Sequence, residues 1–293
     1  MKVLSLFDGI SCGMVALQRA GIKVDKYIAY EIDENAIKVS KANYPEIEQK
    51  GDVFKAEYKD GEFDLLIGGS PCTYWSIAKA GYGRETTSSG IGFQLFMQYV
   101  RALQEAKPKW FLYENNDSIS QDIKNEITKQ LGVVPVMIDS ADFSAQTRKR
   151  CYWTNIPIEQ WERSNIVFKD IVDNETQMPV ANFEKYKGTV KTSKDGMCVS
   201  WDTSGKGNYS QQNRARKPKQ KWNTLTASGT DKNNLYLGGT KYRKLTPRER
   251  ERLQTLPDDY TVCLKSQALR SKAIGNGWTV DVIAYILKGL KHG

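Results

Sequence analysis

An alternation of short apolar runs with longer amphipathic stretches in the first half of the chain leaves few folds open to it. The apolar runs span residues 3–7, 26–31, 63–68, 110–114 and 133–138, and amphipathic stretches such as residues 34–43 and 93–106 lie between them. Strands that alternate with helices predict a mostly parallel sheet covered by helices on both faces, an α/β fold of the Rossmann-like kind. Ligands of such sheets bind beyond the carboxyl ends of the strands.

The alternation fades after about residue 157, and a basic segment follows. The 293-residue chain has a formal charge of +9, but residues 185–250 alone contain 16 Lys or Arg against 4 Asp or Glu. Cations with interleaved aromatic rings in residues 204–226 favour a surface that neutralises phosphates and reaches bases, whereas a generally basic, solvated loop region is the alternative interpretation. Helical patterns return at residues 246–254 and 279–290. Thr246 and Pro247 are expected as the cap and first residue of a helix.

Cysteine and histidine usage excludes several classes of site. The chain has five cysteines without a CxxC pair, no apolar signal stretch and no apolar run of about 18 residues. We therefore expect a reduced, soluble, cytoplasmic protein without a disulfide framework, membrane span or metal site. The single histidine, His292, is next to last. Catalysis by Ser-His-Asp or Cys-His, and any multi-histidine metal site, are therefore nearly excluded.

A glycine-rich turn follows the first predicted strand. It reads Phe7-Asp8-Gly9-Ile10-Ser11-Cys12-Gly13, and glycines there let the backbone approach a ligand closely. Glu31 ends the second strand about 20 residues on, where a carboxylate can bind the ribose hydroxyls of a nucleoside cofactor. Gly51-Asp52-Val53 comes next. Alone, this pattern is shared by many nucleotide-binding folds and fits an ordinary strand-turn-helix corner equally well; no Walker lysine follows, which disfavours a nucleoside triphosphate.

Three further segments carry reactive side chains. Residues 67–77 read Ile-Gly-Gly-Ser-Pro-Cys-Thr-Tyr-Trp-Ser-Ile, residues 113–116 read Tyr-Glu-Asn-Asn, and residues 146–150 read Gln-Thr-Arg-Lys-Arg. Together they offer a nucleophile, an acid and fixed cations. Without the Pro-Cys motif, a solvated strand-end glutamate and an arginine pair on phosphate would be the simpler interpretations.

This set resembles the S-adenosylmethionine-dependent DNA (cytosine-5) methyltransferases of bacterial or phage type, in which Pro-Cys, Glu-Asn and Gln-x-Arg-x-Arg motifs occur in this order. The motifs span residues 2–290 and leave only about 165–240 uncovered. The resemblance implies a catalytic and cofactor-binding domain at residues 1–164 and 263–293. It also implies a small, irregular, basic target-recognition domain at residues 165–262.

The resemblance implies S-adenosyl-L-methionine as the cofactor. Phe7 and Gly9 would border its methionine and adenine parts, Glu31 would hold the ribose, and Asp52 the adenine amino group. The expected cofactor contacts are Phe7, Asp8, Gly9, Ile10, Cys12, Glu31, Ile32, Asp52, Val53, Ser70, Pro71, Asn276, Gly277 and Trp278.

The chemistry explains the reactive residues. Carbon 5 of cytosine is too poor a nucleophile to take a methyl group until a covalent bond at carbon 6 makes the ring enamine-like, and a thiolate suits that step. Cys72 is the expected nucleophile. Glu114 is expected to contact nitrogen 3 and the exocyclic amine of the base. Arg148 and Arg150, on alternate positions of an extended segment, are expected to reach its carbonyl oxygen.

The expected partner is double-stranded DNA, methylated by a monomer in the cytoplasm of a bacterial or phage-infected cell, as in restriction-modification systems. The target base must leave the stack. Residues 73–90, rich in Ser, Thr and Gly, are expected to form the loop that closes over it. The expected DNA contacts are Ser76, Arg214, Arg216, Lys217, Lys219, Lys221 and Thr224.

Some positions depart from the family pattern, and two alternatives stay open. Ile32 stands where many members have an aromatic residue, Asn116 where Val is common, and Gly277-Trp278 where Ser-Val is common. None of these removes a catalytic group. One alternative is a transfer-RNA cytosine methyltransferase, although its Cys-Phe-Thr signature and longer insertions are missing. The other is a DNA-binding module with a vestigial pocket, against which the intact reactive set argues.

Overall fold

A computed structural model describes residues 1–71, 74–75, 85–196, 198–204, 206–207, 209, 213–227 and 234–291. The chain divides into two compact units. The first unit comprises Met1–Ser140, Lys149–Glu162 and Trp278–Gly293, and the second comprises Ala141–Arg148 and Arg163–Gly277. The chain therefore enters the second unit twice, first with a short segment and then with the whole basic region.

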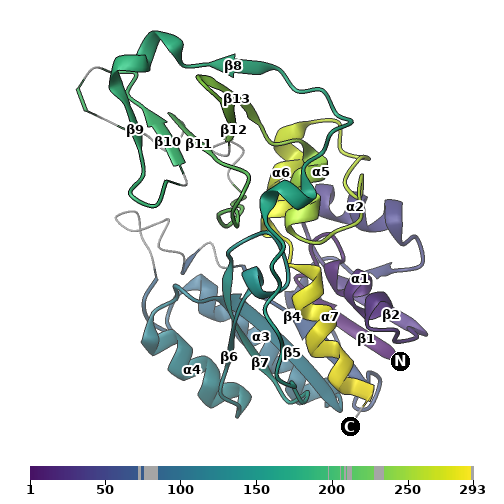
Figure 1. The fold of residues 1–293 in the computed structure, drawn as a ribbon. Coiled ribbons are helices and arrows are strands. Elements are labelled where there is room, and N and C mark those ends of the chain that lie inside the picture. The colour runs from purple at the N-terminus through teal and green to yellow at the C-terminus, as the bar shows by residue number, and fades with distance from the viewer. Residues whose placement is uncertain are drawn as a thin grey trace. The chain divides into compact units, whose positions relative to one another are not determined.

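The first unit is built on a sheet with the strand order β3-β2-β1-β4-β5-β7-β6 (Figure 1). Its strands are β1 (Lys2–Leu6), β2 (Lys26–Tyr30), β3 (Glu48–Gln49), β4 (Leu65–Gly68), β5 (Trp110–Asn116), β6 (Val136–Asp139) and β7 (Lys149–Thr154). Neighbouring strands from β3 to β5 are parallel, whereas β7 is antiparallel to both β5 and β6. The predicted α/β fold with a mostly parallel sheet is confirmed.

Helices cover both faces of this sheet. They are α1 (Cys12–Arg19), α2 (Glu34–Asn43), α3 (Ile91–Ala106), α4 (Gln121–Leu131) and α7 (Val280–Lys288), with short 3-10 helices η1 (Val53–Lys55), η4 (Ser140–Asp142) and η8 (Gly289–Lys291). The side chain of Ile67 in β4 lies against Gly13 of α1. A Cβ on the next residue, Gly68, would lie 3.2 Å from the Tyr99 ring of α3. Because successive residues of a strand face opposite sides, α1 and α3 cover opposite faces.

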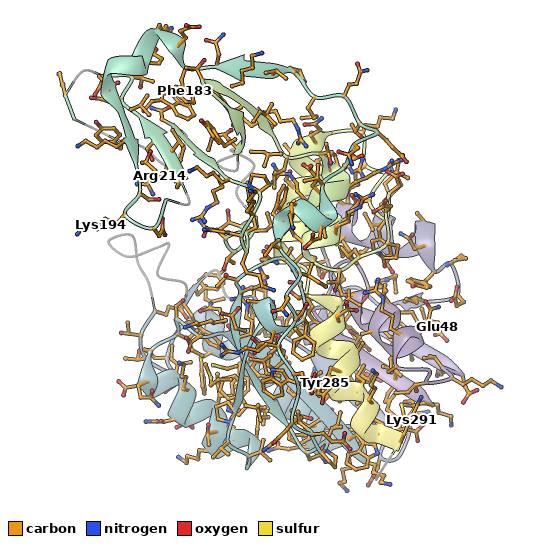
Figure 2. All side chains as sticks on the ribbon, in the orientation of Figure 1. Glu48, Phe183, Lys194, Arg214, Tyr285 and Lys291 are labelled. Atoms are coloured by element: carbon orange, nitrogen blue, oxygen red, sulfur yellow. The ribbon has the colours of Figure 1, made fainter. Side chains whose placement is uncertain are left out.

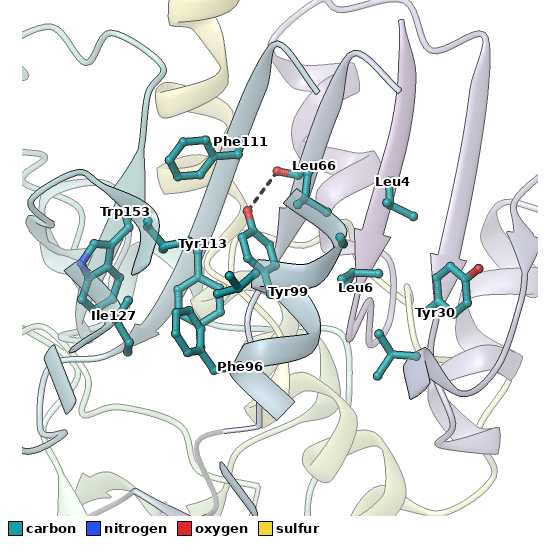
Figure 3. Close-up of a cluster of buried hydrophobic side chains, with 14 of the residues drawn as sticks. Leu4, Leu6, Tyr30, Leu66, Phe96, Tyr99, Phe111, Tyr113, Ile127 and Trp153 are labelled. Carbon is teal, nitrogen blue, oxygen red and sulfur yellow. Dashed lines mark hydrogen bonds between the residues drawn. The ribbon is translucent and has the colours of Figure 1, made fainter. Parts of the chain in front are cut away.

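Aromatic side chains form the core on the α3 face (Figure 3). Phe96 and Tyr99 pack against Tyr113 of β5 with ring centroids 5.1 and 4.9 Å away, and Tyr113 packs against Trp153 of β7 at 5.9 Å. The Tyr99 hydroxyl donates to the backbone carbonyl of Leu66, 3.3 Å away. Large buried rings dominate core energetics. This cluster therefore fixes β5 against β4, and with it the residue that follows Tyr113.

The second unit contains a sheet that the sequence did not predict. Its order is β8-β13-β12-β11-β10-β9. The strands are β8 (Val180–Asn182), β9 (Val190–Thr192), β10 (Cys198–Trp201), β11 (Arg214–Arg216), β12 (Asn234–Gly238) and β13 (Lys241–Lys244). All pairs are antiparallel except β11 with β12. Aromatic rings pack on one face, where Trp201 lies 4.6 Å from Phe183 and 4.7 Å from Tyr242, centroid to centroid.

Helices α5 (Pro247–Leu253) and α6 (Gln267–Asn276), with 3-10 helices η5 (Phe168–Ile171) and η6 (Glu184–Thr189), complete the second unit. Helix α5 begins as predicted: Thr246 caps it, Pro247 is its first residue, and the Thr246 hydroxyl accepts from the Glu249 backbone N–H at 3.0 Å. Glu249 is fully buried and pairs with Arg243, whose guanidinium nitrogen lies 2.6 Å from a carboxylate oxygen.

Candidate functional site

In the first unit, the residues singled out in the sequence lie where parallel strands end. Phe7 follows β1, Glu31 follows β2, Asp52 comes after β3, Gly69-Ser70-Pro71 follow β4, and Glu114 lies near the end of β5. Because these strands are parallel neighbours, their carboxyl ends meet at one edge of the sheet. The candidate site of this unit is that edge.

Asp8 organises the turn after β1. The turn has positive φ at Phe7, Gly9 and Ser11. The Asp8 carboxylate is buried; Oδ1 accepts from the hydroxyls of Ser5 and Tyr27 at 2.6 and 2.7 Å, and Oδ2 accepts from the hydroxyl of Ser11. Burial raises the pKa of Asp8 above its ordinary value, against the effect of these hydrogen bonds. Both oxygens are thus engaged by hydroxyls of the turn and of strands β1 and β2.

Glu31 ties the ends of β1 and β2 together. Its Oε2 accepts from the backbone N–H of Gly9 at 2.8 Å, and Oε1 accepts from those of Ile32 and Asp33, each at 2.8 Å. The side chain of Ile32 is 73% exposed. The end of β2 therefore presents a carboxylate in fixed orientation beside an exposed apolar side chain.

The segment after β3 places a second exposed apolar side chain near a carboxylate. Asp52 Oδ1 accepts from the backbone N–H of Phe54 at 3.0 Å. Val53 is buried, whereas Phe54, which no sequence motif indicated, is 51% exposed. Phe7 packs partly against the main core cluster. Two other expected cofactor contacts are buried in the core, Ile10 and Cys12.

The turn after β4 is tied to β5. The hydroxyls of Ser70 and Tyr113 lie 2.6 Å apart, and the Asn115 side chain donates to the Ser70 carbonyl at 3.3 Å and to the Tyr113 hydroxyl at 3.2 Å. Pro71 is exposed. Two predicted site residues lie outside the described residues, the expected nucleophile Cys72 and Ser76.

Glu114 is held on both oxygens. The Arg150 Nε lies 2.9 Å from Oε1, and the Trp278 indole N–H donates to Oε2 at 3.0 Å. Arg150 reaches this position because β7 pairs with β5, with Arg150 opposite Asn116. A Cβ on Gly69 would lie 3.0 Å from Oε2 and 2.8 Å from the Glu114 carbonyl oxygen, so only glycine fits there without displacement. The contact of Trp278 was not predicted.

Arg148 makes different contacts from Arg150. It is buried in the second unit, where it donates to the backbone carbonyls of Leu225 at 3.0 Å, Gly275 at 3.2 Å and Gly277 at 3.1 Å. Its guanidinium therefore joins backbone segments of that unit. Of the neighbouring expected cofactor contacts, Asn276 is exposed and Gly277 is buried.

The polar departure at Asn116 is satisfied locally. Its side chain is buried, and Oδ1 accepts from the backbone N–H of Ser118 at 2.9 Å. This arrangement closes the turn after β5, a usual role of Asn.

The expected DNA-contacting residues of the second unit divide into two groups. The Lys221 ammonium donates to the carbonyls of Ala141, Ser144 and Ser164 at 2.6, 2.9 and 2.9 Å. These bonds use all three donors of an ammonium group. The Thr224 hydroxyl donates to the Thr147 carbonyl at 2.7 Å. By contrast, Arg214, Lys217 and Lys219 are exposed and Arg216 is half-buried.

A basic face of the second sheet was not visible in the sequence. Residues directly opposite in paired strands point to the same face. Lys191 lies opposite Ser200, and Ser200 lies opposite Arg214, so the three form one row across β9, β10 and β11. Their strand neighbour Trp201 is buried on the other face. Arg214 is the first residue of β11 (Figure 2). The Lys191 ammonium lies 4.5 Å from the centroid of the Tyr209 ring.

Two further features bear on the class of site. Within the ranges that the structure describes, no three or more His, Cys, Asp or Glu side chains gather as metal ligands would. None of the helices in those same ranges has the length and apolar character needed to cross a membrane.

Comparison with known proteins identifies relatives along the whole chain. Residues 1–292 match the family model described as C-5 cytosine-specific DNA methylase. The type II methyltransferase M.NgoPII of Neisseria gonorrhoeae is 26% identical, over 99% of this chain and 95% of that protein. A putative DNA modification methyltransferase from an E. coli prophage has a similar fold, with a TM-score of 0.66, 20% identity and coverage of 100% and 99% of the two chains. The Entamoeba histolytica methyltransferase EhMeth gives a TM-score of 0.70 at 16% identity, with 100% and 98% coverage.

Proposed function

The chain belongs to the C-5 cytosine-specific DNA methylase family, and on this basis we propose that it transfers a methyl group from S-adenosylmethionine to carbon 5 of a cytosine flipped out of double-stranded DNA. The observation that carries the proposal is the Glu114 carboxylate, held by Arg150 and Trp278. It lies against Gly69, three residues before Cys72. One edge of the sheet thus brings an acid next to the turn that leads into the nucleophile.

The cofactor fits the ends of β1, β2 and β3. A carboxylate oxygen accepts about two hydrogen bonds, so Glu31 Oε2, which accepts one from Gly9, can take a ribose hydroxyl as well. Ile32 and Phe54 offer exposed apolar surface for adenine, and Asp52 Oδ2 offers an acceptor for its amino group. When bound, S-adenosylmethionine supplies a methyl group on a positively charged sulfur.

Cys72 is the proposed nucleophile. Its thiolate adds to carbon 6 of cytosine, forming a carbon–sulfur bond, and the displaced electron pair moves toward nitrogen 3. This makes carbon 5 nucleophilic, so carbon 5 would take the methyl group while the methyl–sulfur bond of the cofactor breaks and its sulfur leaves as a neutral thioether. Loss of the carbon 5 proton to a base and departure of the Cys72 sulfur as thiolate then restore the aromatic ring.

Glu114 and Arg150 are proposed to bind the base. Glu114 contacts nitrogen 3 and the exocyclic amine, and shares a proton with nitrogen 3 as negative charge develops there. The Nε of Arg150 pairs with Glu114, and one Nη donates to the Lys149 carbonyl. Its other Nη has no hydrogen-bond partner among the described residues and is placed to serve the carbonyl oxygen of the base. Arg148 supports the second unit instead.

We assign catalysis and cofactor binding to the first unit and DNA recognition to the second. Support for the second assignment is the row of Lys191, Ser200 and Arg214 on a face away from the aromatic core. Both cations are exposed, and Arg214 makes one long hydrogen bond, 3.5 Å from its guanidinium to the Tyr209 carbonyl, so most of its donors are left for phosphates. Arg216, Lys217 and Lys219 follow in the chain, whereas Lys221 and Thr224 hold the unit together.

Transfer of a tritiated methyl group from labelled S-adenosylmethionine to DNA or to RNA tests the proposal. We expect labelling of double-stranded DNA by the wild type and none by Cys72→Ser, because an alcohol is a far weaker nucleophile than a thiolate. DNA with 5-fluorocytosine should trap wild-type protein covalently, since fluorine cannot leave as a proton does. Labelling of transfer RNA alone would instead support the RNA enzyme, and DNA binding without labelling the vestigial module.

A further inference from the structure

The indole of Trp278, which is distant in sequence, is hydrogen-bonded to the Glu114 carboxylate. It donates to Glu114 Oε2 at 3.0 Å, across 164 residues of sequence. Gly69 lies beside both groups, since a Cβ there would be 3.0 Å from Oε2 and 3.5 Å from the indole nitrogen. Glu114 is about 12% exposed, so little solvent competes for its oxygens.

The segment that carries Trp278 is anchored by two contacts at the start of α7. The next residue, Thr279, accepts a hydrogen bond from the Ser140 hydroxyl at 2.9 Å. Asp281, in the first turn of α7, pairs with Arg19 of α1 at 2.7 Å. These contacts hold the start of α7 against the rest of the first unit. They therefore limit the movement of the indole away from the Glu114 carboxylate.

The two donors act on Glu114 differently. Arg150 brings a positive charge to Oε1, whereas an indole N–H is a neutral donor that cannot accept a proton. Together they fix the rotation of the carboxyl group and leave each oxygen one further hydrogen-bonding position, one for the exocyclic amine and one for the proton shared with nitrogen 3. A polar group that is oriented in advance needs no reorganisation when charge develops on the substrate.

We propose that Trp278 is a positioning residue for this reaction, which orients the Glu114 carboxylate toward nitrogen 3 and the exocyclic amine of the flipped cytosine. The inference rests on the proposed role of Glu114. It gives the Trp at this position a function in turnover, where the sequence alone showed only a bulky departure from a common Val.

The test removes the indole N–H. Trp278→Phe should lower kcat roughly 10- to 100-fold, the usual worth of a hydrogen bond to a charged group. The KM values for cofactor and DNA should stay within about twofold, because Glu114 acts as charge develops. Trp153→Phe is the matched control: it also loses one indole N–H bond in this unit, to the Thr128 hydroxyl at 2.9 Å. It should lower thermal stability but leave kcat within about twofold, because Phe keeps a ring against Tyr113 and Glu114 keeps both of its donors.

A double-mutant cycle separates positioning from general support. In a Glu114→Gln background, Trp278→Phe should change the residual kcat by less than about threefold. Benzothienylalanine at position 278 keeps the fused ring and replaces the N–H by sulfur. It should lower kcat as much as Trp278→Phe does, and it provides the test if the Phe variant folds poorly. An unchanged kcat in both position-278 variants would overturn the inference about Trp278 but not the proposed role of Glu114. An equal loss of kcat from Trp278→Phe in the wild-type and Glu114→Gln backgrounds would do the same. Full activity of Glu114→Gln would overturn the proposed role of Glu114 itself.

Discussion

Asp8 lies in the predicted cofactor-binding turn, but its carboxyl oxygens accept hydrogen bonds from other residues of the protein. Its oxygens accept from Ser5, Ser11 and Tyr27, and burial raises its pKa. A carboxyl group with a raised pKa contributes most stability below its unfolded pKa of about 4, and that contribution is lost as pH rises through the folded pKa.

We therefore expect the free energy of unfolding to depend on pH in a way that Asp8→Asn abolishes. The variant loses an acceptor and should be less stable than wild type at about pH 4, but the gap should shrink as pH rises, because only the wild type must then bury a charge. Urea unfolding at several pH values measures the gap. A gap that widens toward neutral pH would show that the ionised carboxylate is favoured in the turn.

Glu31 and Glu114 lie at the ends of different strands of the same sheet, and substitutions of the two should change different kinetic constants. Glu31 fixes the backbone of the first turn and is assigned to the ribose, so Glu31→Ala should raise the KM for S-adenosylmethionine by about tenfold or more. Glu114→Gln should instead lower kcat by roughly 10² or more. Initial rates at varied cofactor concentration separate the two, and exchanged effects would mean that the two strand ends have been assigned to the wrong ligands.

Helix α5 depends on a buried ion pair more than on its surface charges. Glu249 is fully buried, pairs with Arg243, and accepts from the backbone N–H of Thr246 at 2.9 Å. Glu249→Gln should cost about 3–5 kcal/mol of stability, since it leaves the arginine charge buried and unpaired. Asp258→Asn breaks the exposed pair with Arg252 and should cost about 1 kcal/mol or less. Thermal unfolding compares them, and equal losses would mean that the buried pair adds nothing.

Apolar runs and long amphipathic stretches were predictable, and short strands in a polar segment were not. The helix expected at residues 34–43 is α2 at Glu34–Asn43, and the expected strands of the first sheet, which are short but apolar, lie within a few residues of those observed. Strands β8 to β13 are as short, three to five residues, but they lie in a polar segment without such runs. Their pairing depends on contacts between distant segments, as does the bond from Trp278 to Glu114.

The basic residues of the whole molecule have two roles: some make internal hydrogen bonds, and others are exposed to solvent. Composition singled out five cations between residues 214 and 221 but could not tell which of them are satisfied internally. The structure separates them: Lys221 donates to three backbone carbonyls, while Arg214, Lys217 and Lys219 are exposed. Lys191, outside that cluster in sequence, joins Arg214 through strand pairing.

The salt dependence of DNA binding distinguishes exposed cations that contact phosphates from cations that make internal hydrogen bonds. Each phosphate contact contributes about 0.9 to the slope of log K against log salt concentration. Arg214→Gln and Lys191→Gln should each flatten the slope by about one, with similar losses on all DNA sequences, because most protein–DNA hydrogen bonds go to the backbone. Lys221→Met should lower thermal stability and leave the slope unchanged in protein that stays folded, because its ammonium already has three partners. If Lys221→Met flattened the slope while the other two did not, DNA would meet a different surface of the second unit, and the face that carries Lys191 and Arg214 would be only a solvated one.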